Sequence, residues 1–306
     1  MERYLDKVYR ELRSRFGEAI QKDVSLSRYT SFGVGGPASI FVTPSSESHL
    51  LFLVKFFTRE QIPFFVLGRG TNILVSDSGF DGAVISLGED FKEISFEANL
   101  VWASSSVPLQ HLVEQTSMRS LTGFEALTGI PGSVGGALKM NAGAWGFSIS
   151  QFVRRIVGLR KNGESISITP KESDWTYRGF VHNDIIFTKA LFELQPGKAD
   201  EIKTAIAEYS ARRHKSQPVG ERSAGCVFKN PEPDMPAAKI IDQLGLKGER
   251  IGEAYVSSKH ANFIVAHPGA TARDIYLLMR KIQKIVRDKT GIYLEPEIIL
   301  LGEFEE

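Results

Sequence analysis

The sequence has few of the features that mark secreted, membrane-bound or nucleic-acid-binding proteins. It contains one cysteine in 306 residues, so it cannot form an internal disulfide framework. Its formal net charge of +1 gives no electrostatic case for binding nucleic acid or a membrane surface. Its apolar runs are short and interrupted by charge, and its first residues lack the apolar core of a secretory signal. We therefore expect a cytoplasmic protein that binds no nucleic acid, no membrane and no metal. Its oligomeric state stays undetermined, and the sequence is compatible with a monomer.

Two common nucleotide-binding motifs are also missing. Gly33-Val34-Gly35 has no third glycine at the spacing of the dinucleotide fingerprint, and no helix pattern follows it. No glycine-rich segment ends in Gly-Lys-Ser or Gly-Lys-Thr. The sequence therefore predicts neither a dinucleotide fold of the Rossmann type nor a P-loop enzyme.

Glycine is abundant in one apolar stretch, residues 123–146, which holds seven glycines and almost no charge. A flexible linker would be polar and rich in serine. Glycines in an apolar background indicate a sharp buried turn, or a backbone whose N–H groups bind a phosphate. The stretch alone leaves both alternatives open, but glycine turns at 32–37 and 67–72 in the same strand-rich half favour a cofactor site.

The spacing of apolar residues predicts the main elements. Helices are expected over 1–16, 46–57, 202–215 and 271–291. For the last helix, Thr271 is the expected N-cap, with Asp274 at the capping-box position and Gly291 as the stop. Short strands are expected at 64–67, 73–75, 83–87, 91–96, 101–104, 156–159, 165–168 and 185–194. A domain boundary is expected between about 196 and 220.

Six segments resemble, in order along the chain, the UDP-N-acetylenolpyruvoylglucosamine reductase (MurB) family. They lie at 29–36, 67–74, 129–136, 177–178, 223–231 and 294–297. The resemblance implies an α+β protein whose FAD-binding domain, 1–200, has the vanillyl-alcohol-oxidase (PCMH) fold in two subdomains, about 20–85 and 86–200. A C-terminal α+β substrate-binding domain would follow at 201–306. The short span from 231 to 254 implies the family type that lacks a long tyrosine-bearing loop.

The resemblance implies a function in peptidoglycan precursor synthesis. The expected reaction is the NADPH-dependent, FAD-mediated reduction of UDP-N-acetylglucosamine enolpyruvate to UDP-N-acetylmuramate. The alternative is another FAD-dependent oxidase or dehydrogenase of this fold that acts on an alcohol or sugar. Thr71-Asn72 stand where oxidase relatives carry a histidine that tethers the flavin, so FAD is expected to bind non-covalently.

The matched motifs also carry over the family's FAD-binding positions. The expected cofactor-binding residues are Gly33, Gly35, Gly68, Arg69, Gly70, Thr71, Asn72, Gly129, Pro131, Gly132, Ser133, Gly136, Asn141 and Gly143. For Asn72, an ordinary role as a turn former is the alternative.

Arg178 and Glu297 match catalytic positions of the family. Adding hydride to an enolpyruvyl group produces an enolate, whose charge a guanidinium can hold through two hydrogen bonds without losing its own proton. Glu297 would help to orient or protonate the intermediate. The alternatives are a surface arginine, and a solvated pair of Glu295 and Glu297 on one face of a strand.

Cys226 departs from the serine that most members of the family carry as proton donor. A thiol has an ordinary pKa near 8.5 and is a stronger acid than an alcohol, so the resemblance implies that Cys226 is the donor. A small buried core residue is the alternative. Tyr177, Lys215 and Asn230 match substrate-binding positions.

Overall fold

A computed structural model describes residues 2–232 and 234–305. The chain forms two compact units, each assembled from separate segments. Unit 1 comprises Met1–Gln21, Ile40–Arg69 and Gly82–Arg212, and unit 2 comprises Lys22–Ser39, Gly70–Asp81 and Arg213–Glu306. The units therefore do not follow the expected domain ranges, because two short early segments group with the C-terminal part. The expected ranges divide the chain by the ligand that each part binds, and this division stays a prediction.

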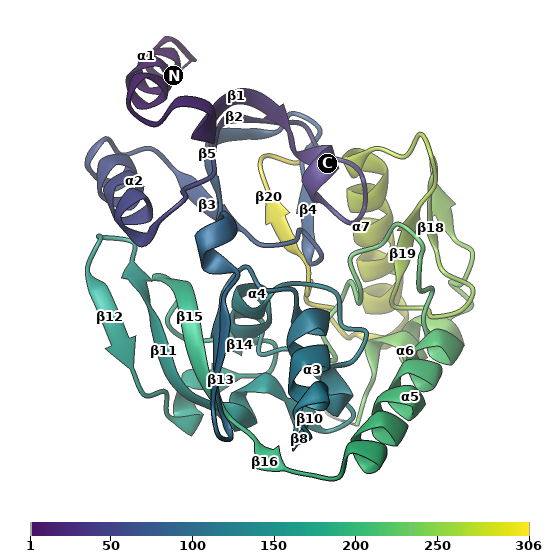
Figure 1. Ribbon diagram of the computed structural model, residues 1–306. Helices are drawn as coiled ribbons and strands as arrows, with labels where there is room; N and C mark the ends of the chain where they lie inside the picture. The colour runs from purple at the N-terminus through teal and green to yellow at the C-terminus, as the bar shows by residue number, and fades with distance from the viewer. Residues whose placement is uncertain (1, 233, 306) are drawn as a thin grey trace. The chain divides into compact units, whose positions relative to one another are not determined.

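The centre of unit 1 is an antiparallel five-stranded sheet (Figure 1). Its strands, in spatial order, are β12 (Ser165–Ile168), β11 (Val153–Arg160), β15 (Ile185–Glu193), β7 (Leu100–Ser104) and β6 (Ile94–Glu97). Apolar side chains of this sheet share one core with α3 (Leu109–Met118) and α4 (Val134–Lys139). The expected strand at 91–96 begins only at Ile94, because Phe91 is buried at the end of a 3-10 turn.

A second core of unit 1 lies around the first two helices, α1 (Glu2–Phe16) and α2 (Glu47–Arg59). The helix over 46–57 is confirmed with its cap, because the Ser46 hydroxyl accepts a hydrogen bond from the His49 N–H at 3.2 Å. A four-stranded sheet accompanies these helices in the order β1 (Ile20–Ser25), β2 (Pro37–Val42), β5 (Phe80–Ser86) and β3 (Phe64–Leu67). The chain passes from one unit to the other within β1, β2 and β5.

Unit 2 packs two helices against a small antiparallel sheet. The helices are α6 (Ala237–Gln243) and α7 (Ala272–Thr290), and the strands are β17 (Arg250–Ile251), β18 (Ala254–Val256) and β19 (Ile264–Ala266). The ends of α7 are confirmed: Thr271 and Asp274 form the capping box, and Gly291 has the left-handed φ of 75°. The Asp77 carboxylate also accepts hydrogen bonds from the Ala272 and Arg273 N–H groups, both at 2.9 Å. This contact ties the early segment Gly70–Asp81 to the start of α7.

An early segment and the C-terminal segment of unit 2 meet in a parallel strand pair. Figure 1 shows β20 (Ile299–Leu301), in yellow, beside β4 (Ile73–Val75). The strand begins at Ile299, so the alternative that places Glu295 and Glu297 as a pair on one strand face is wrong. Glu295 instead pairs with the Lys229 ammonium at 2.6 Å.

The helix expected over 202–215 is α5 (Ala199–Ser216), which begins in unit 1 and ends in unit 2. The remaining elements are short. They are η1 (Gly17–Ala19), η2 (Leu26–Tyr29), η3 (Glu89–Phe91), β8 (Leu121–Thr122), η4 (Glu125–Leu127), β9 (Gly143–Ala144), β10 (Phe147–Ser148), η5 (Ile149–Phe152), η6 (Glu172–Asp174), β13 (Trp175–Thr176), β14 (Gly179–Phe180) and β16 (Gln195–Pro196).

Candidate functional site

Two of the predicted glycine turns meet within unit 1. A Cβ atom added to Gly68 would lie 2.9 Å from the Ser133 hydroxyl oxygen. Ser133 also caps α4, since its hydroxyl accepts from the Gly136 N–H at 3.4 Å. Among the described residues, the backbone N–H groups of Gly68, Arg69, Gly132 and Ser133 have no protein acceptor. Unused N–H groups on two adjoining turns fit a phosphate-bearing cofactor such as FAD.

Positive φ angles explain two glycines of the second turn. Gly129 has a φ of 73° and Gly132 a φ of 141°, a region that favours glycine. The exposed Pro131 lies between them. The turn therefore depends on glycine through its own backbone conformation, which is why its sequence pattern is visible.

Sequence reasoning missed Ser105, which lies against this turn. Its carbonyl accepts a hydrogen bond from the Gly135 N–H at 2.9 Å. Its hydroxyl is buried and has no hydrogen-bond partner among the described residues, so a polar group of a bound ligand would satisfy it. Nothing local distinguishes Ser105 from its serine neighbours in the sequence.

A second group in unit 1 joins predicted cofactor residues to the predicted catalytic arginine. Arg178 Nη1 donates to the Gly143 carbonyl at 2.9 Å, and Asn141 Nδ2 donates to the Thr176 carbonyl at 3.1 Å. The Asn141 carboxamide oxygen is buried and has no hydrogen-bond partner in the described part of the chain. A hydrogen-bond donor of a bound ligand would satisfy this oxygen.

The backbone of Arg178 is strained. It occupies the two-residue turn between β13 and β14 with a φ of 59°, which is unusual for a residue with a long side chain. Such outliers persist where surrounding contacts hold them, and they cluster at functional sites. The neighbouring Tyr177 is 53% exposed, and its ring centre lies 5.3 Å from the Arg178 guanidinium carbon.

In unit 2, the predicted glycines are explained by packing inside the protein. A Cβ on Gly35 would lie 2.8 Å from the Val75 Cβ, and one on Gly70 would overlap the Tyr29 carbonyl oxygen. Gly33 has a φ of 70°, whereas a Cβ there would meet the Arg222 side chain only at an ordinary contact distance of 3.4 Å. Close approach of protein atoms to Gly35 and Gly70, and the backbone conformation of Gly33, therefore give these glycines a structural reason, and their contact with FAD stays a prediction. Gly143 of unit 1 has the same kind of reason, the Phe147 carbonyl oxygen.

Asn72 connects the glycine turn at 67–72 to the predicted catalytic residue Glu297 within unit 2. Thr71 and Asn72 lead directly into β4, and the Asn72 side-chain amide donates to the Glu297 carbonyl at 3.2 Å. The Asn72 carbonyl accepts from the Ile299 N–H at 3.0 Å, where the pairing of β4 with β20 begins. The structure therefore brings Asn72 and Glu297 together.

Cys226 lies on a segment that is bonded along both edges. On one edge, the Val227 carbonyl accepts from the Glu297 N–H at 2.7 Å, and the Lys229 N–H donates to the Glu295 carbonyl at 2.8 Å. On the other edge, Cys226 pairs with Phe263 as an isolated antiparallel bridge. We call the segments 226–229, 260–263 and 295–297 the Cys226 ladder. It brings Cys226 and Glu297 into neighbouring segments.

The last two predicted substrate residues lie elsewhere in unit 2. Lys215 is exposed in the last turn of α5. Asn230 follows the Cys226 ladder, and its carboxamide oxygen accepts from the Ala237 N–H at 3.1 Å, at the first residue of α6. Asn230 therefore has a structural contact in addition to its predicted one.

Two titratable side chains close to these segments have shifted pKa values. Burial lowers the pKa of His260, and the charge of Lys247 lowers it further. The neutral ring can accept at Nδ1, where the Asn262 N–H lies 3.3 Å away. Burial, with help from Lys161, also lowers the pKa of Lys139, whose ammonium donates to the Asn183 carboxamide oxygen at 2.9 Å.

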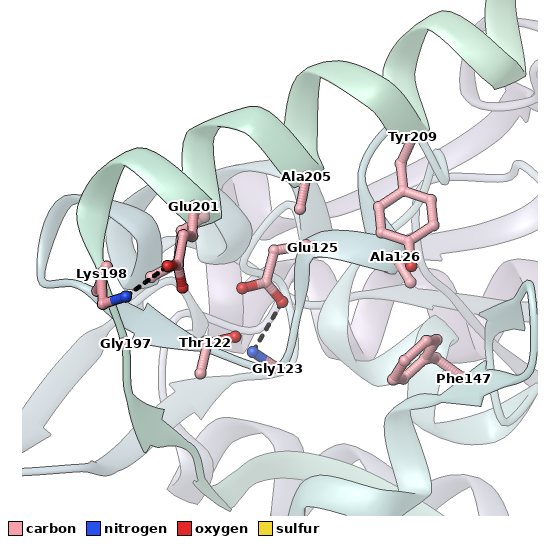
Figure 2. Close-up of a pocket in the computed structure, with 11 residues that line it drawn as sticks. Thr122, Gly123, Glu125, Ala126, Phe147, Gly197, Lys198, Glu201, Ala205 and Tyr209 are labelled. Carbon is pink, nitrogen blue, oxygen red and sulfur yellow. Dashed lines mark hydrogen bonds and ion pairs between the residues drawn. The ribbon is translucent and has the colours of Figure 1, made fainter.

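A pocket of about 300 Å³ in unit 1 is separate from these groups (Figure 2). It lies between α5 and the start of the 123–146 stretch. Its polar contacts are internal, since Lys198 pairs with Glu201 at 2.7 Å and Glu125 accepts from the Gly123 N–H at 2.8 Å. Its walls contain none of the predicted site residues. The lining residues are Thr122, Gly123, Glu125, Ala126, Phe147, Gly197, Lys198, Glu201, Ile202, Ala205 and Tyr209.

The described residues hold no group of three His, Cys, Asp or Glu side chains that could bind a metal ion. None of the helices within residues 2–232 and 234–305 is long and apolar enough to cross a membrane.

Comparison with known proteins identifies two family models along the chain. Residues 38–167 match an FAD binding domain, and residues 217–301 match the C-terminal domain of UDP-N-acetylenolpyruvoylglucosamine reductase. The predicted order of an FAD-binding α+β part followed by a C-terminal part of this reductase is confirmed.

Whole-length relatives agree with these models. The UDP-N-acetylenolpyruvoylglucosamine reductase of Syntrophus aciditrophicus is 40% identical over 299 residues, which is 96% of this chain and 95% of that protein. The reductase of Caldanaerobacter subterraneus is 38% identical over 280 residues, covering 91% of this chain and 92% of that protein. The crystal structure of the reductase (MurB) from Thermus caldophilus is similar with a TM-score of 0.80 and 34% identity, covering 92% of this chain and 100% of that one.

Proposed function

The chain belongs to the UDP-N-acetylenolpyruvoylglucosamine reductase family, and we propose that it reduces UDP-N-acetylglucosamine enolpyruvate to UDP-N-acetylmuramate, with FAD as cofactor and NADPH as electron donor. One observation in the structure supports this activity in addition to family membership. In each unit, a residue predicted to bind FAD is hydrogen-bonded to the backbone or side chain of a residue predicted to be catalytic: Gly143 to Arg178 and Asn72 to Glu297. Such links couple the cofactor site to the reacting groups.

FAD, when bound, supplies the hydride that it receives from NADPH. The backbone N–H groups of Gly68, Arg69, Gly132 and Ser133 are proposed to bind its phosphates. The remaining contacts are assigned by the resemblance to Gly33, Gly35, Gly70, Thr71, Asn72, Gly129, Pro131, Gly136, Asn141 and Gly143. In this proposal residues 1–200 hold the cofactor and 201–306 the substrate.

Arg178 and Glu297 are proposed to stabilise the enolate that forms when hydride adds to the enolpyruvyl double bond. Arg178 stays charged throughout, and its bond to the Gly143 carbonyl fixes the guanidinium before the substrate arrives. Tyr177, Lys215 and Asn230 are proposed to bind the substrate nucleotide, for which the exposed ring of Tyr177 and the exposed ammonium of Lys215 are accessible.

Cys226 is proposed to deliver the proton. Hydride adds to one carbon of the double bond, and the thiol proton passes to the adjacent carbon; solvent then returns a proton to the thiolate. The half-buried position of Cys226 keeps the thiol close to both protein and solvent. A donor that has to stay reduced also favours a reducing compartment, so we place the enzyme in the cytoplasm.

Rapid mixing of the purified flavoprotein tests this function in two half-reactions. NADPH should bleach the flavin absorbance, and the enolpyruvyl nucleotide should then restore it. With Cys226→Ala, bleaching should survive while restoration slows by about 100-fold or more. The matched variant Cys226→Ser, which returns a hydroxyl donor, should retain measurable restoration.

Two results would contradict the proposal in different ways. If the wild-type protein does not bind FAD, or if the enolpyruvyl nucleotide does not reoxidise it, the reductase function is wrong. If Cys226→Ala performs both half-reactions at the wild-type rate, the function stands and the role of Cys226 is wrong.

A further inference from the structure

The side chain of Asn262 bonds to the segment that carries Cys226. Asn262 Nδ2 donates to the Phe228 carbonyl at 2.7 Å, and Asn262 Oδ1 accepts from the Phe228 N–H at 3.0 Å. The Asn262 carbonyl accepts from the Val227 N–H at 2.8 Å. Asn262 is 3% exposed and Phe228 1% exposed, so these bonds lie away from bulk water.

This side chain takes the place of a missing strand partner. A carboxamide carries the same donor and acceptor as a peptide group, so Asn262 can bond both backbone groups of one residue. The antiparallel bridge between Cys226 and Phe263 does not extend to Phe228, and the Asn262 carboxamide continues the hydrogen bonding there. Without that carboxamide, two buried backbone groups would lose their partners.

The opposite edge of the segment is bonded to the residues around Glu297. The Val227 carbonyl accepts from the Glu297 N–H, and Phe228 forms an isolated bridge with Pro296. The backbone N–H and carbonyl groups of Val227 and Phe228 are therefore all hydrogen-bonded, either to Asn262 or to the Glu297 N–H. The position of the preceding residue, Cys226, follows from this fixed backbone.

We propose that Asn262 is a positioning residue for proton donation by Cys226. This inference rests on the proposed function, in which the Cys226 thiol donates the proton. Asn262 acts through the backbone of 227–228 and sets the position of the Cys226 Cα relative to Glu297. Proton transfer depends steeply on the distance between donor and acceptor, so a small backbone shift slows this step first.

The test uses the FAD-loaded enzyme and the two half-reactions described above. Asn262→Leu removes both side-chain hydrogen bonds at similar volume. Asn262→Asp keeps an acceptor for the Phe228 N–H, and only its protonated carboxyl can again donate to the Phe228 carbonyl. Asn99→Leu is the matched control, because the Asn99 amide also donates to a backbone carbonyl, that of Leu194 at 2.9 Å, in unit 1.

The expected result is a selective loss in the substrate half-reaction. Asn262→Leu should slow flavin reoxidation by the enolpyruvyl nucleotide at least about tenfold, with reduction by NADPH within about twofold of wild type. The solvent deuterium isotope effect on reoxidation should rise above the wild-type value, because proton transfer becomes more rate-limiting. Asn262→Asp should regain reoxidation, relative to wild type at the same pH, as the pH falls and its carboxyl is protonated. Asn99→Leu should change neither half-reaction.

Other outcomes overturn the inference. Asn262 has only a structural role if both half-reactions slow in parallel, or if reoxidation and its isotope effect stay at wild-type values. If Asn262→Leu does not fold, the pH-dependent recovery of Asn262→Asp decides the question alone. The Cys226→Ala variant separates the two proposals. If its flavin reoxidation is unchanged, Cys226 is not the proton donor and the inference about Asn262 loses its premise. If its reoxidation collapses while the Asn262 variants behave as wild type, only the positioning role of Asn262 is wrong.

Discussion

The glycine turns at 68–72 and 129–136 and the Cys226 ladder are held in their conformations by different forces. The turns depend on local backbone geometry: Gly70, Gly129 and Gly132 all have positive φ angles. The Cys226 ladder depends on hydrogen bonds between segments that are far apart in sequence, such as Val227 with Asn262 and with Glu297. A turn of the first kind leaves a visible mark on its own sequence. A ladder of the second kind leaves almost none.

This difference predicts how each region responds to substitution. At the positive-φ glycines of the turns, Gly70, Gly129 and Gly132, a side chain strains the backbone, so a single added methyl group disrupts the turn. A hydrogen-bonded ladder can lose one bond and keep its fold, because neighbouring bonds and buried side chains such as Phe228 remain. Defects in the turns should therefore abolish cofactor binding, whereas defects in the ladder should change rates.

The largest expected effect comes from comparing the same substitution in a glycine turn and directly beside the Cys226 ladder. Gly70→Ala combines a φ of 62° with overlap between the new Cβ and the Tyr29 carbonyl oxygen. It should lower the free energy of unfolding by about 3 kcal/mol or more and yield protein without FAD. Gly225→Ala, beside Cys226, has a φ of 77° and no other heavy atom within 4 Å of the new Cβ. It should cost about 1–2 kcal/mol and retain FAD.

Thermal denaturation and the flavin absorbance per protein measure both variants. The comparison of the two regions fails if Gly70→Ala binds a full complement of FAD, or if Gly225→Ala loses as much stability as Gly70→Ala.

The same difference explains what the sequence predicted. The ends of α7 were predictable because Thr271, Asp274 and Gly291 act on their own neighbours. The glycine turns were predictable for the same reason. The conformation around Glu297 was not, because the apolar run after it resembles a strand while pairing with β4 begins only at Ile299.

Partners across long sequence separations were also missed. Asn262 and Ser105 carry no local pattern that distinguishes them, and their contacts exist only once the chain has folded. The close approach of Tyr29 to Gly70 is another case, since only the folded structure shows that protein backbone fills that space. The motifs predicted which residues matter, but the sequence could not predict which protein groups hold them.

A smaller effect is expected at Asn72, where the two regions meet within unit 2. Asn72→Ala removes the hydrogen bond to the Glu297 carbonyl, a neutral bond of about 1 kcal/mol, equivalent to about fivefold in rate. Reoxidation by the enolpyruvyl nucleotide should slow by that factor while FAD content stays unchanged. Asn162→Ala, which removes an exposed turn contact to Glu164, is the matched control. A weaker affinity for FAD with normal reoxidation would instead assign Asn72 to the glycine turn.

The smallest expected effect is a pH dependence of the Cys226 ladder through His260. Because burial and Lys247 lower its pKa below the ordinary 6.5, the folded protein holds this proton less tightly than the unfolded chain does. The contribution of neutral His260 to the free energy of unfolding is complete above about pH 6.5 and is lost as the pH falls through its lower pKa in the folded protein. His260→Asn places an acceptor that does not titrate near the position of Nδ1, which accepts from the Asn262 N–H. Urea denaturation between pH 5 and 8 should show the wild type losing more free energy of unfolding than this variant toward the acid end. Identical pH profiles would mean that protonation of His260 leaves the ladder unaffected.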